Sequence, residues 1–371
     1  MSIPALFAIA GCGAVSAAGN AAGQTAASWL AQARVTRRVQ LPQQARAVTL
    51  APCDSVCHQL QGVARLLAML PSALAEALSP ALEQEICQRA QHGYSVAACL
   101  LLPDWLSQAD CQQLQQAWQR FLQTRLPGVP VASRILQRGT VAAWEMLEAG
   151  WQQLQQHPHT GYLLLAAVDS WCEASRLKFA LQHQLLLSEG NQDGFVAGEA
   201  AAAVVLQVVA RTPAGWQAGL PAPAPERLLL HRPALDYASY GFWPQAQAAQ
   251  RAAAAQQLRH TLAQAMAHAG LQTDQLSHLA SDMDGSGWRA QIENEALSML
   301  LYHGPRSAAS RLPQQQLAGM LGQTGCVSGL LPWALQPHLQ RIQPCNSLLH
   351  WSVAASGQTA ACVLERSSPP A

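Results

Sequence analysis

Residues Ser188–Val208 read SEGNQDGFVAGEAAAAVVLQV, a polar turn and a Gly-Glu pair followed by small and branched apolar residues. The segment Glu199–Val209 has the length of a strand and is apolar on both of the faces that a strand presents. A strand with one face in water alternates polar and apolar residues, whereas a strand buried between two layers does not. The stretch therefore predicts a fully buried strand, and Gly194 and Gly198 lie in the segment that leads into it.

Two other segments of the first half have the same continuous apolar character. Tyr94–Leu102 (YSVAACLLL) and Gly161–Val168 (GYLLLAAV) are predicted strands, and predicted helices over Asp110–Arg125 and Gly139–Gln156 lie between them. Buried strands separated by helices are typical of a sheet that helices cover on both faces. The expected fold class is therefore α/β.

The rest of the chain extends this pattern in both directions. We expect a strand over 3–10, a turn at Gly11-Cys12-Gly13, a helix over 21–34, and two helices within 56–91 that break near Pro71. The proline-rich segment 213–226 is predicted to connect an N-terminal half, 1–212, to a C-terminal half, 227–371. In the second half we predict a helix over 244–270, a strand over 277–281 and a helix over 288–301. A further helix that ends near 340 and a hairpin of 348–353 with 359–365 follow.

Composition excludes several functions. The chain has 371 residues, a formal net charge of +1 and no arginine-rich stripe, which argues against nucleic-acid binding. Its ten cysteines lack the spacing of a metal site or a disulfide framework, so we expect free thiols in a reducing compartment, no metal and no cofactor. The N-terminal segment lacks the basic residues that begin a signal peptide. No apolar run reaches the ~18 residues of a membrane span. The cytoplasm is the expected location.

Four stretches together resemble the β-ketoacyl synthases of the thiolase superfamily. The opening AIAGCGAVSAAGNAAGQTAASWLAQAR is similar to the first strand, glycine turn and first helix of that family. LLLAAVDS, with the block Asp193-Gly194-Phe195 and Gly198-Glu199, resembles its D-G-F-x-x-G-E-x-A region. LASDMDGSGWRAQIENEA and PCNSLLHWSVAASGQTAACVLE resemble its histidine turn and its closing hairpin.

The resemblance implies a five-layered α-β-α-β-α fold of two pseudo-equivalent halves, which commonly dimerises through a strand of the first half. It also implies a reaction in which an acyl chain moves to a cysteine at a strand-to-helix turn and then joins a decarboxylated malonyl thioester. That chemistry needs an activated thiolate, backbone donors for the oxyanion and two imidazoles that stabilise the enolate.

The reactive positions of the family are replaced in this sequence. The nucleophile position is expected at Val131, within GVPVASRILQ, a segment that contains no cysteine. The two histidine positions are expected at Asp284 and Met320. An ionised Asp284 would repel an enolate rather than stabilise it. It could instead cap the helix predicted near Trp288.

Two side chains are candidates for a substitute nucleophile. Ser133 is the hydroxyl nearest to the expected turn, but no activating base lies near it in sequence. Cys326 opens a helix in a glycine-rich segment, where the helix dipole could lower the pKa of its thiol, although a free cysteine is more commonly a small buried hydrophobe. The remaining candidates are the pocket residues His350, Asn346 and Gly319 and the acids Glu199 and Glu295, for which burial and backbone hydrogen bonds are a sufficient role.

Three functions from different classes fit these observations. The favoured hypothesis is a protein that has lost condensing activity and acts as a non-catalytic acyl-pocket or partner-binding subunit. It would form a homodimer or pair with an active ketosynthase, with an acyl carrier protein or acyl thioester as a further partner. The alternative is an active acyltransferase of the 3-oxoacyl-thioester synthase type, or a hydrolase, with Cys326 or Ser133 as nucleophile and Asp284 as base. The third is a chaperone or adaptor for a secreted or assembled partner.

Overall fold

The computed structural model describes residues 5–40, 47–156, 160–212, 215–216, 227–238, 248–301 and 312–367. The connector predicted at 213–226 lies outside these ranges, apart from the short strand β8 (Gly215–Trp216). The elements before and after it form two sheets.

Five strands build the first sheet, in the order β1-β7-β6-β4-β5. β7 is antiparallel to both β1 and β6, whereas β4 is parallel to both β6 and β5. These strands are β1 (Ala5–Ser16), β4 (Ser95–Leu102), β5 (Val131–Gln137), β6 (Thr160–Ser170) and β7 (Ala197–Thr212).

Five strands of the C-terminal half repeat this arrangement in the order β9-β14-β13-β11-β12. β14 is antiparallel to β9 and β13, and β11 is parallel to β13 and β12, so both the strand order and the directions match the first sheet. β9 also pairs with β1 and joins the two sheets. The halves are therefore pseudo-equivalent, although no repeat is visible in the sequence. The strands are β9 (Leu228–Leu230), β11 (His278–Ser281), β12 (Gln314–Gln316), β13 (Ser347–Val353) and β14 (Gln358–Arg366).

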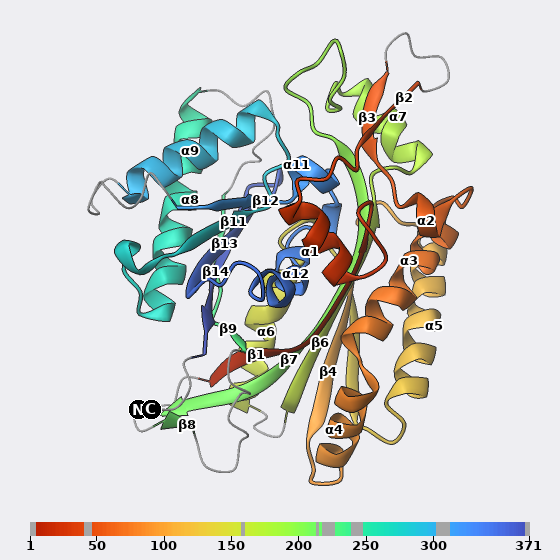
Figure 1. Ribbon diagram of the computed structural model, residues 1–371, viewed down its shortest axis with the longest axis vertical. Coiled ribbons are helices and arrows are strands. Elements are labelled where there is room, and N and C mark those ends of the chain that lie inside the picture. The colour runs from red at the N-terminus through yellow and green to blue at the C-terminus, as the bar shows by residue number, and fades with distance from the viewer. Residues whose placement is uncertain are drawn as a thin grey trace.

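Helices lie outside and between the two sheets (Figure 1). The outer face of the first sheet is covered by α3 (Gly62–Ala77), α4 (Pro80–Ala90) and α5 (Gln108–Arg125). The outer face of the second is covered by α8 (Ala248–Ala269) and α9 (Gly287–Leu301). Between the sheets lie α1 (Ala22–Leu30), α6 (Ala142–Gln156) and α12 (Leu331–Leu339). This confirms the expected α-β-α-β-α layering.

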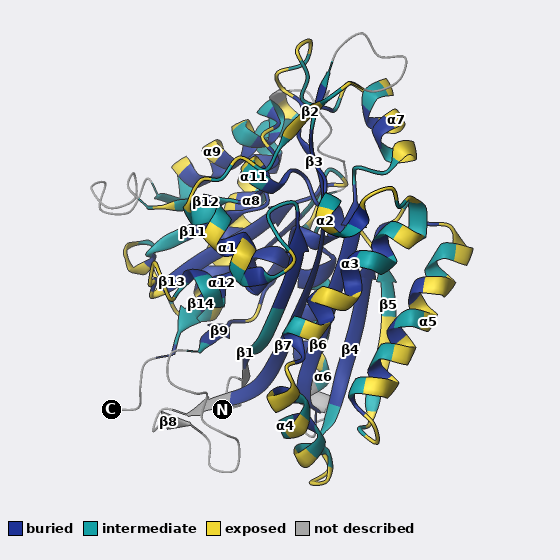
Figure 2. Cartoon of the chain, turned by 45° about the vertical axis from the view of Figure 1, so that its right-hand side comes forward, coloured by how far each residue is buried: buried dark blue, intermediate teal, exposed yellow. Residues whose placement is uncertain are grey.

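Strand β7 explains why the stretch after Glu199 shows no alternation. Its even-numbered residues from 200 to 206 belong to the core between the two sheets, and its odd-numbered residues from 201 to 205 belong to the core beneath α3 and α5. Successive side chains of a strand point to opposite faces, so both faces must be apolar when both are covered. Figure 2 shows β7, β6 and β4 buried among helices whose outer faces are exposed.

The turn predicted at Gly11-Cys12-Gly13 is wrong, because β1 continues through it to Ser16. The glycines are required by a close approach of helix α3 instead. A Cβ atom on Gly11 would lie 2.1 Å from the carbonyl oxygen of Ala77, and one on Gly13 would lie 2.1 Å from that of Ala73. A glycine within a strand pattern often marks such a contact rather than a turn.

The helix break predicted near Pro71 is also wrong. Pro71 lies inside α3, and the helix ends only at Ala77. The break comes at Ser79, whose hydroxyl accepts a hydrogen bond from the Leu82 N–H at the start of α4. Burial of one face of α3 outweighs the single backbone hydrogen bond that a proline removes.

The remaining elements are small, and most lie at the edges of this framework. Among the described residues no single helix is long and apolar enough to span a membrane; α3 and α4 pass that test only as a pair, and 70° separates their directions. The small elements are β2 (Arg37–Val39), β3 (Val48–Ala51), α2 (Asp54–Cys57), α7 (Ala174–Gln182), β10 (Ala234–Tyr237), η1 (Thr273–Gln275), α11 (Ala318–Leu321) and η2 (Gly325–Val327).

Candidate functional site

A cavity of about 360 Å³ lies where the parallel strands of both sheets end. The carboxyl ends of parallel strands are the usual position of ligand sites in α/β proteins. Loops from both halves meet there, so the cavity depends on the duplicated fold. Its wall includes the turn from β5 to α6, the loop after β6, the loop from β11 to α9, residues 323–326 and residues 353–356.

The strand-to-helix turn in this wall is Arg138-Gly139-Thr140, which contains no thiol. Its first residue is anchored by a hydrogen bond from the Arg138 N–H to the carbonyl oxygen of Leu102 (3.2 Å). The Thr140 hydroxyl is buried and has no hydrogen-bond partner among the described residues. This turn occupies the place in the fold where the resemblance puts the nucleophile.

Val131 and Ser133 do not reach the cavity, so their assignment to the strand-to-helix turn is wrong. Both lie on β5, the outermost strand of the first sheet, and the turn comes only after Gln137. Ser133 is exposed, and its hydroxyl accepts a hydrogen bond from the Trp118 indole N–H (2.9 Å).

Asp284 does line the cavity, and its carboxylate is held by the protein itself. Ser286 donates its backbone N–H and its hydroxyl to Asp284 Oδ1 (3.0 and 2.6 Å). Oδ2 lies 3.6 Å from Arg289 Nη1 in the first turn of α9. These contacts fit the structural interpretation, in which the aspartate orders the start of that helix.

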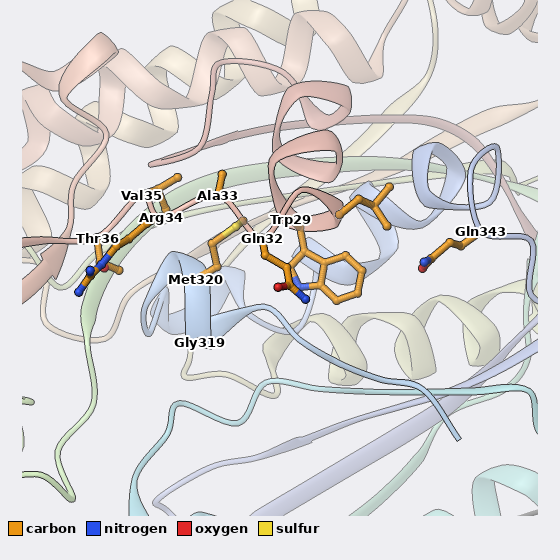
Figure 3. A pocket seen from close by; sticks show the side chains of 10 residues that line it. Trp29, Gln32, Ala33, Arg34, Val35, Thr36, Gly319, Met320 and Gln343 are labelled. Atoms are coloured by element: carbon orange, nitrogen blue, oxygen red, sulfur yellow. The ribbon is translucent and has the colours of Figure 1, made fainter. Parts of the chain in front are cut away.

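Gln323, rather than Met320, is the residue of the glycine-rich segment that faces Asp284. Gln323 Nε2 donates a hydrogen bond to Asp284 Oδ2 (3.4 Å). Met320 and Gly319 instead line a separate pocket beside the end of α1, as Figure 3 shows. Gly319 is exposed, so neither residue joins the expected site. Sequence reasoning missed Gln323, although it stands beside the turn glycine Gly322.

The Asp-Gly-Phe block positions this part of the cavity. A Cβ atom on Gly198 would lie 2.0 Å from the carbonyl oxygen of Leu321, so only glycine allows β7 to approach the Gln323 segment so closely. Gln323 then exchanges backbone hydrogen bonds with Gly198 and Val196 (3.1 and 2.7 Å). Phe195 forms part of the wall, whereas Asp193 is exposed.

Gly194 completes that block through another close contact. A Cβ atom there would lie 2.3 Å from the carbonyl carbon of Leu186. The Phe195 ring, held next to it, packs edge-on against Trp171 with centroids 4.9 Å apart. The block is therefore structural, and it shapes the cavity without supplying a reactive group.

Cys326 cannot serve as an activated nucleophile in this structure. Its thiol is buried and points to the carbonyl oxygens of Val168 (3.6 Å) and Leu101 (3.8 Å). Burial raises the pKa of the Cys326 thiol well above its usual range, and the nearby Asp169 carboxylate raises it further. The expected helix dipole is missing because the residue lies in a three-residue 3-10 turn.

Of the two glutamates predicted to be buried structural acids, only Glu199 is buried. Glu199 is fully buried, pairs with Arg65, and accepts hydrogen bonds from the Cys53 N–H and the Ser170 hydroxyl. Glu295 is exposed, so its assignment as a buried acid is wrong. The buried acid of α9 is Glu293, which accepts from the Ser281 hydroxyl (2.8 Å) and pairs with Arg289. The two glutamates are separated by one residue, which the helical period places on different faces.

The expected pocket residues His350 and Asn346 do not line the cavity. His350 is fully buried between the sheets, packed against Trp144 and Trp333 with ring centroids 4.6 and 6.1 Å away. Burial lowers the pKa of His350 to about 3, so the ring is neutral. Asn346 is exposed.

A cysteine and a histidine do meet elsewhere, at a different cavity of about 500 Å³ beside β1 and the end of α12. Cys12 Sγ lies 3.6 Å from His338 Nε2. Burial raises the pKa of Cys12 to about 12, with a further rise from Glu76, and burial lowers the pKa of His338. Both groups are therefore neutral at pH 7, which is the opposite of an activated thiolate–imidazolium pair.

Neither a protein-family model nor a curated protein matches the sequence. Solved structures do match the fold over nearly the whole chain. The AntDE:AntF structure, a type II PKS acyl-carrier protein in complex with its ketosynthase, matches with a TM-score of 0.73 at 12% identity, over 98% of this chain and 99% of that one. The ketosynthase ApeO in complex with its chain length factor ApeC from Xenorhabdus doucetiae matches with a TM-score of 0.67 at 13% identity, over 98% of each chain.

A ketosynthase from module 6 of the bacillaene synthase of Bacillus subtilis 168 gives a TM-score of 0.70 at 12% identity, over 98% of this chain and 72% of that one. The chain therefore has the thiolase-like fold of ketosynthases and chain length factors. At identities this low, the structural similarity establishes the fold alone, and the function must be argued from the site.

Proposed function

We propose that the chain is a ketosynthase-fold subunit that does not condense acyl chains itself and that works by pairing with an active ketosynthase. The supporting observation is the chemistry of its cavity. The strand-to-helix turn carries Gly139 and Thr140 in place of a thiol, and it shares the cavity with Asp284 and Gln323 in place of imidazoles. Condensation needs a nucleophile and cationic or neutral donors for an enolate, and a carboxylate opposes that negative charge.

The alternative with relocated catalytic residues loses its support. Ser133 lies on the exposed edge of β5, away from the cavity. The Cys326 thiol is buried and protonated. Asp284, the proposed base, is already engaged by Ser286 and Arg289. No observation favours an adaptor for a secreted partner.

The edge of β5 is the surface proposed for pairing. Within the described residues no strand pairs with its outer side, and Ala132, Ser133 and Arg134 are exposed there. An open strand edge presents unpaired N–H and C=O groups that another strand can satisfy. This agrees with the resemblance, which implies dimerisation through a strand of the first half. In the absence of a ketosynthase, two copies of the chain would use the same edge.

The proposed setting is cytoplasmic, because all ten cysteines are free. An acyl carrier protein would deliver the acyl thioester to the pair.

The test combines the purified chain with an acyl thioester and a malonyl thioester, with and without an active ketosynthase from the same organism. We expect no condensation product from the chain alone, co-elution with the ketosynthase, and an altered product length when both are present. A ketosynthase with its cysteine changed to alanine is the matched control, and it should pair without forming product. Condensation by the chain alone would refute the proposal.

A further inference from the structure

Arg176, in the first turn of α7, lines the cavity with few polar partners of its own. Its side chain is only 14% exposed, and its Nε is buried without a hydrogen-bond partner among the described residues. Asp104 is the one described carboxylate within 4 Å of the guanidinium, with Oδ1 3.8 Å from Nη1, and that carboxylate is 72% exposed. A guanidinium carries five N–H donors, and at 3.8 Å this contact is too long to be a hydrogen bond.

Aromatic rings hold the guanidinium in place. Its Cζ lies 3.5 Å from the ring centroid of Trp171 and 5.7 Å from that of Trp105. Stacking on a ring face fixes the plane of the guanidinium but leaves its N–H groups free for another acceptor. A largely buried cation without hydrogen bonds is costly, so it marks a place where an acceptor is expected.

The acids of the cavity wall do not provide that acceptor, because they are committed elsewhere. Asp169 accepts hydrogen bonds from the Trp105 indole and from the N–H groups of Ser170 and Cys326 (3.1, 2.7 and 3.0 Å). Asp284 is engaged by Ser286 and Arg289, as described above. Each of these carboxylates therefore has a set of hydrogen-bond donors that does not include Arg176. Burial lowers the pKa of Arg176, and the charges of Asp169 and Asp104 oppose that fall without a hydrogen bond to the guanidinium.

Further donors and apolar groups surround the same space. Thr140 and Trp171 belong to the cavity wall, and the Thr140 hydroxyl and the Trp171 indole N–H are buried without a hydrogen-bond partner among the described residues. Arg138 stands at the rim, with a side chain that is 59% exposed and an Nε 3.9 Å from Glu145. The rest of the wall is largely apolar and includes Phe179, Leu185, Phe195, Trp288 and Val353.

We propose that this cavity binds a small organic carboxylate with a compact apolar body, whose carboxylate pairs with the guanidinium of Arg176. A planar guanidinium binds a carboxylate through two parallel N–H···O bonds, and the aromatic and aliphatic wall buries the apolar body. The cavity of about 360 Å³ fits an acid the size of phenylacetate rather than a long acyl chain. The inference goes beyond the proposed function, because this ligand needs no partner subunit.

A carboxylate fits better than a phosphate. The cavity wall holds three arginines, of which Arg138 stands at the rim and Arg289 is already paired with three buried carboxylates, so Arg176 is the largely buried cation without a short ion pair. The carboxylates of Asp104, Asp169 and Asp284 lie in the same wall. A dianion would be repelled by these acids more strongly than a monoanion. Its hydration would also be harder to replace in a largely apolar site.

The experiment measures binding of phenylacetate by calorimetry and by its effect on the melting temperature, with phenylacetamide as the neutral control of equal size. We expect saturable binding of phenylacetate to the wild-type chain and at least tenfold weaker binding of phenylacetamide. Arg176→Gln should weaken phenylacetate binding at least tenfold. Arg38→Gln, which removes an exposed arginine outside the cavity, should leave it unchanged. Inorganic phosphate should not compete.

Several results would overturn the proposal: no saturable phenylacetate binding, equal binding of acid and amide, or unchanged binding by Arg176→Gln. Equal competition by phosphate would do so too. The acid and amide comparison uses only the wild-type chain, so it remains decisive if Arg176→Gln fails to fold. If phenylacetate does not bind, the proposed pairing with a ketosynthase is unaffected, because co-elution measures that pairing separately.

Discussion

At the scale of single residues, four buried charged side chains form a group centred on Arg289 in the part of the chain that the structure describes. This one guanidinium, 1% exposed, pairs with Asp282, Asp284 and Glu293. Three carboxylates around one cation cannot all be ionised without repulsion. Burial raises the pKa of Glu293 to about 7, while Arg289 opposes that rise and Asp282 adds to it.

Glu293→Gln should therefore change how stability depends on pH. The pKa of Glu293 rises from its ordinary value of 4.5 to about 7 on folding, so the folded state keeps a proton that the unfolded state releases. That contribution is complete below pH 4.5 and is lost as the pH rises through 7, at most about 1.4 kcal/mol per pH unit. Urea unfolding should show that the wild type loses more stability than Glu293→Gln between pH 5 and pH 8.

Glu295→Gln is the matched control, because Glu295 is exposed on the same helix. Its unfolding free energy should follow that of the wild type at every pH. Parallel curves for Glu293→Gln and the wild type would show that Glu293 does not titrate in this range.

At the scale of elements, the approach of α3 to β1 depends on two glycines that look like turn residues in the sequence. Sequence periodicity predicted most strands and helices, because apolar runs and helical spacing follow directly from burial. It could not predict Gly11 and Gly13 as strand residues, since the reason is a helix that arrives from a distant segment. For the same reason the sequence predicts a helix break near Pro71, whereas packing of α3 against the sheet stabilises a helix that continues through this residue.

Gly13→Ala should destabilise the protein by about 2 kcal/mol or more, because the new methyl group would lie 2.1 Å from the Ala73 carbonyl oxygen and force α3 outward. Gly319→Ala is the control. Gly319 lies in helix α11, is exposed, and has open space around the added Cβ. That substitution should leave stability unchanged or raise it slightly. Chemical denaturation checks both, and equal effects would contradict the close-packing argument.

The edge strand β5 allows a similarly direct test of pairing. The Pro130 carbonyl and the Arg138 N–H bond to β4, so backbone groups of even-numbered residues face β4 and those of odd-numbered residues face outward. Ser133→Pro therefore removes an outward N–H without removing a hydrogen bond to β4. We expect at least tenfold weaker subunit association in analytical ultracentrifugation.

Ser133→Ala loses the same hydrogen bond from Trp118 but keeps the backbone N–H, so it should associate like the wild type. If Ser133→Pro pairs normally while remaining folded, β5 is not the interface.

At the scale of the whole molecule, two copies of one topology create the cavity between them. The sequence resemblance predicted this fold because its motifs are glycines and buried residues that serve packing, such as Gly198 and Glu199. It predicted the site poorly, because loops that converge from distant segments must be aligned to the residue. The sequence predicts Met320 for a position at which Gln323 faces the cavity, and it predicts Val131 for a turn that lies at Gly139. No sequence pattern could identify Arg176 as a binding residue, because its lack of hydrogen-bond partners depends on which distant residues the fold places around it.

The central claim is that the ketosynthase architecture persists here without a group able to carry an acyl chain. Intact-mass measurement after incubation with an excess of acyl thioester tests it most directly, with an active ketosynthase treated in parallel as the control. We predict that the mass of this chain stays unchanged while the control gains one acyl group. A stoichiometric mass increase that maps to Cys326, Thr140 or another residue of the cavity would contradict the claim.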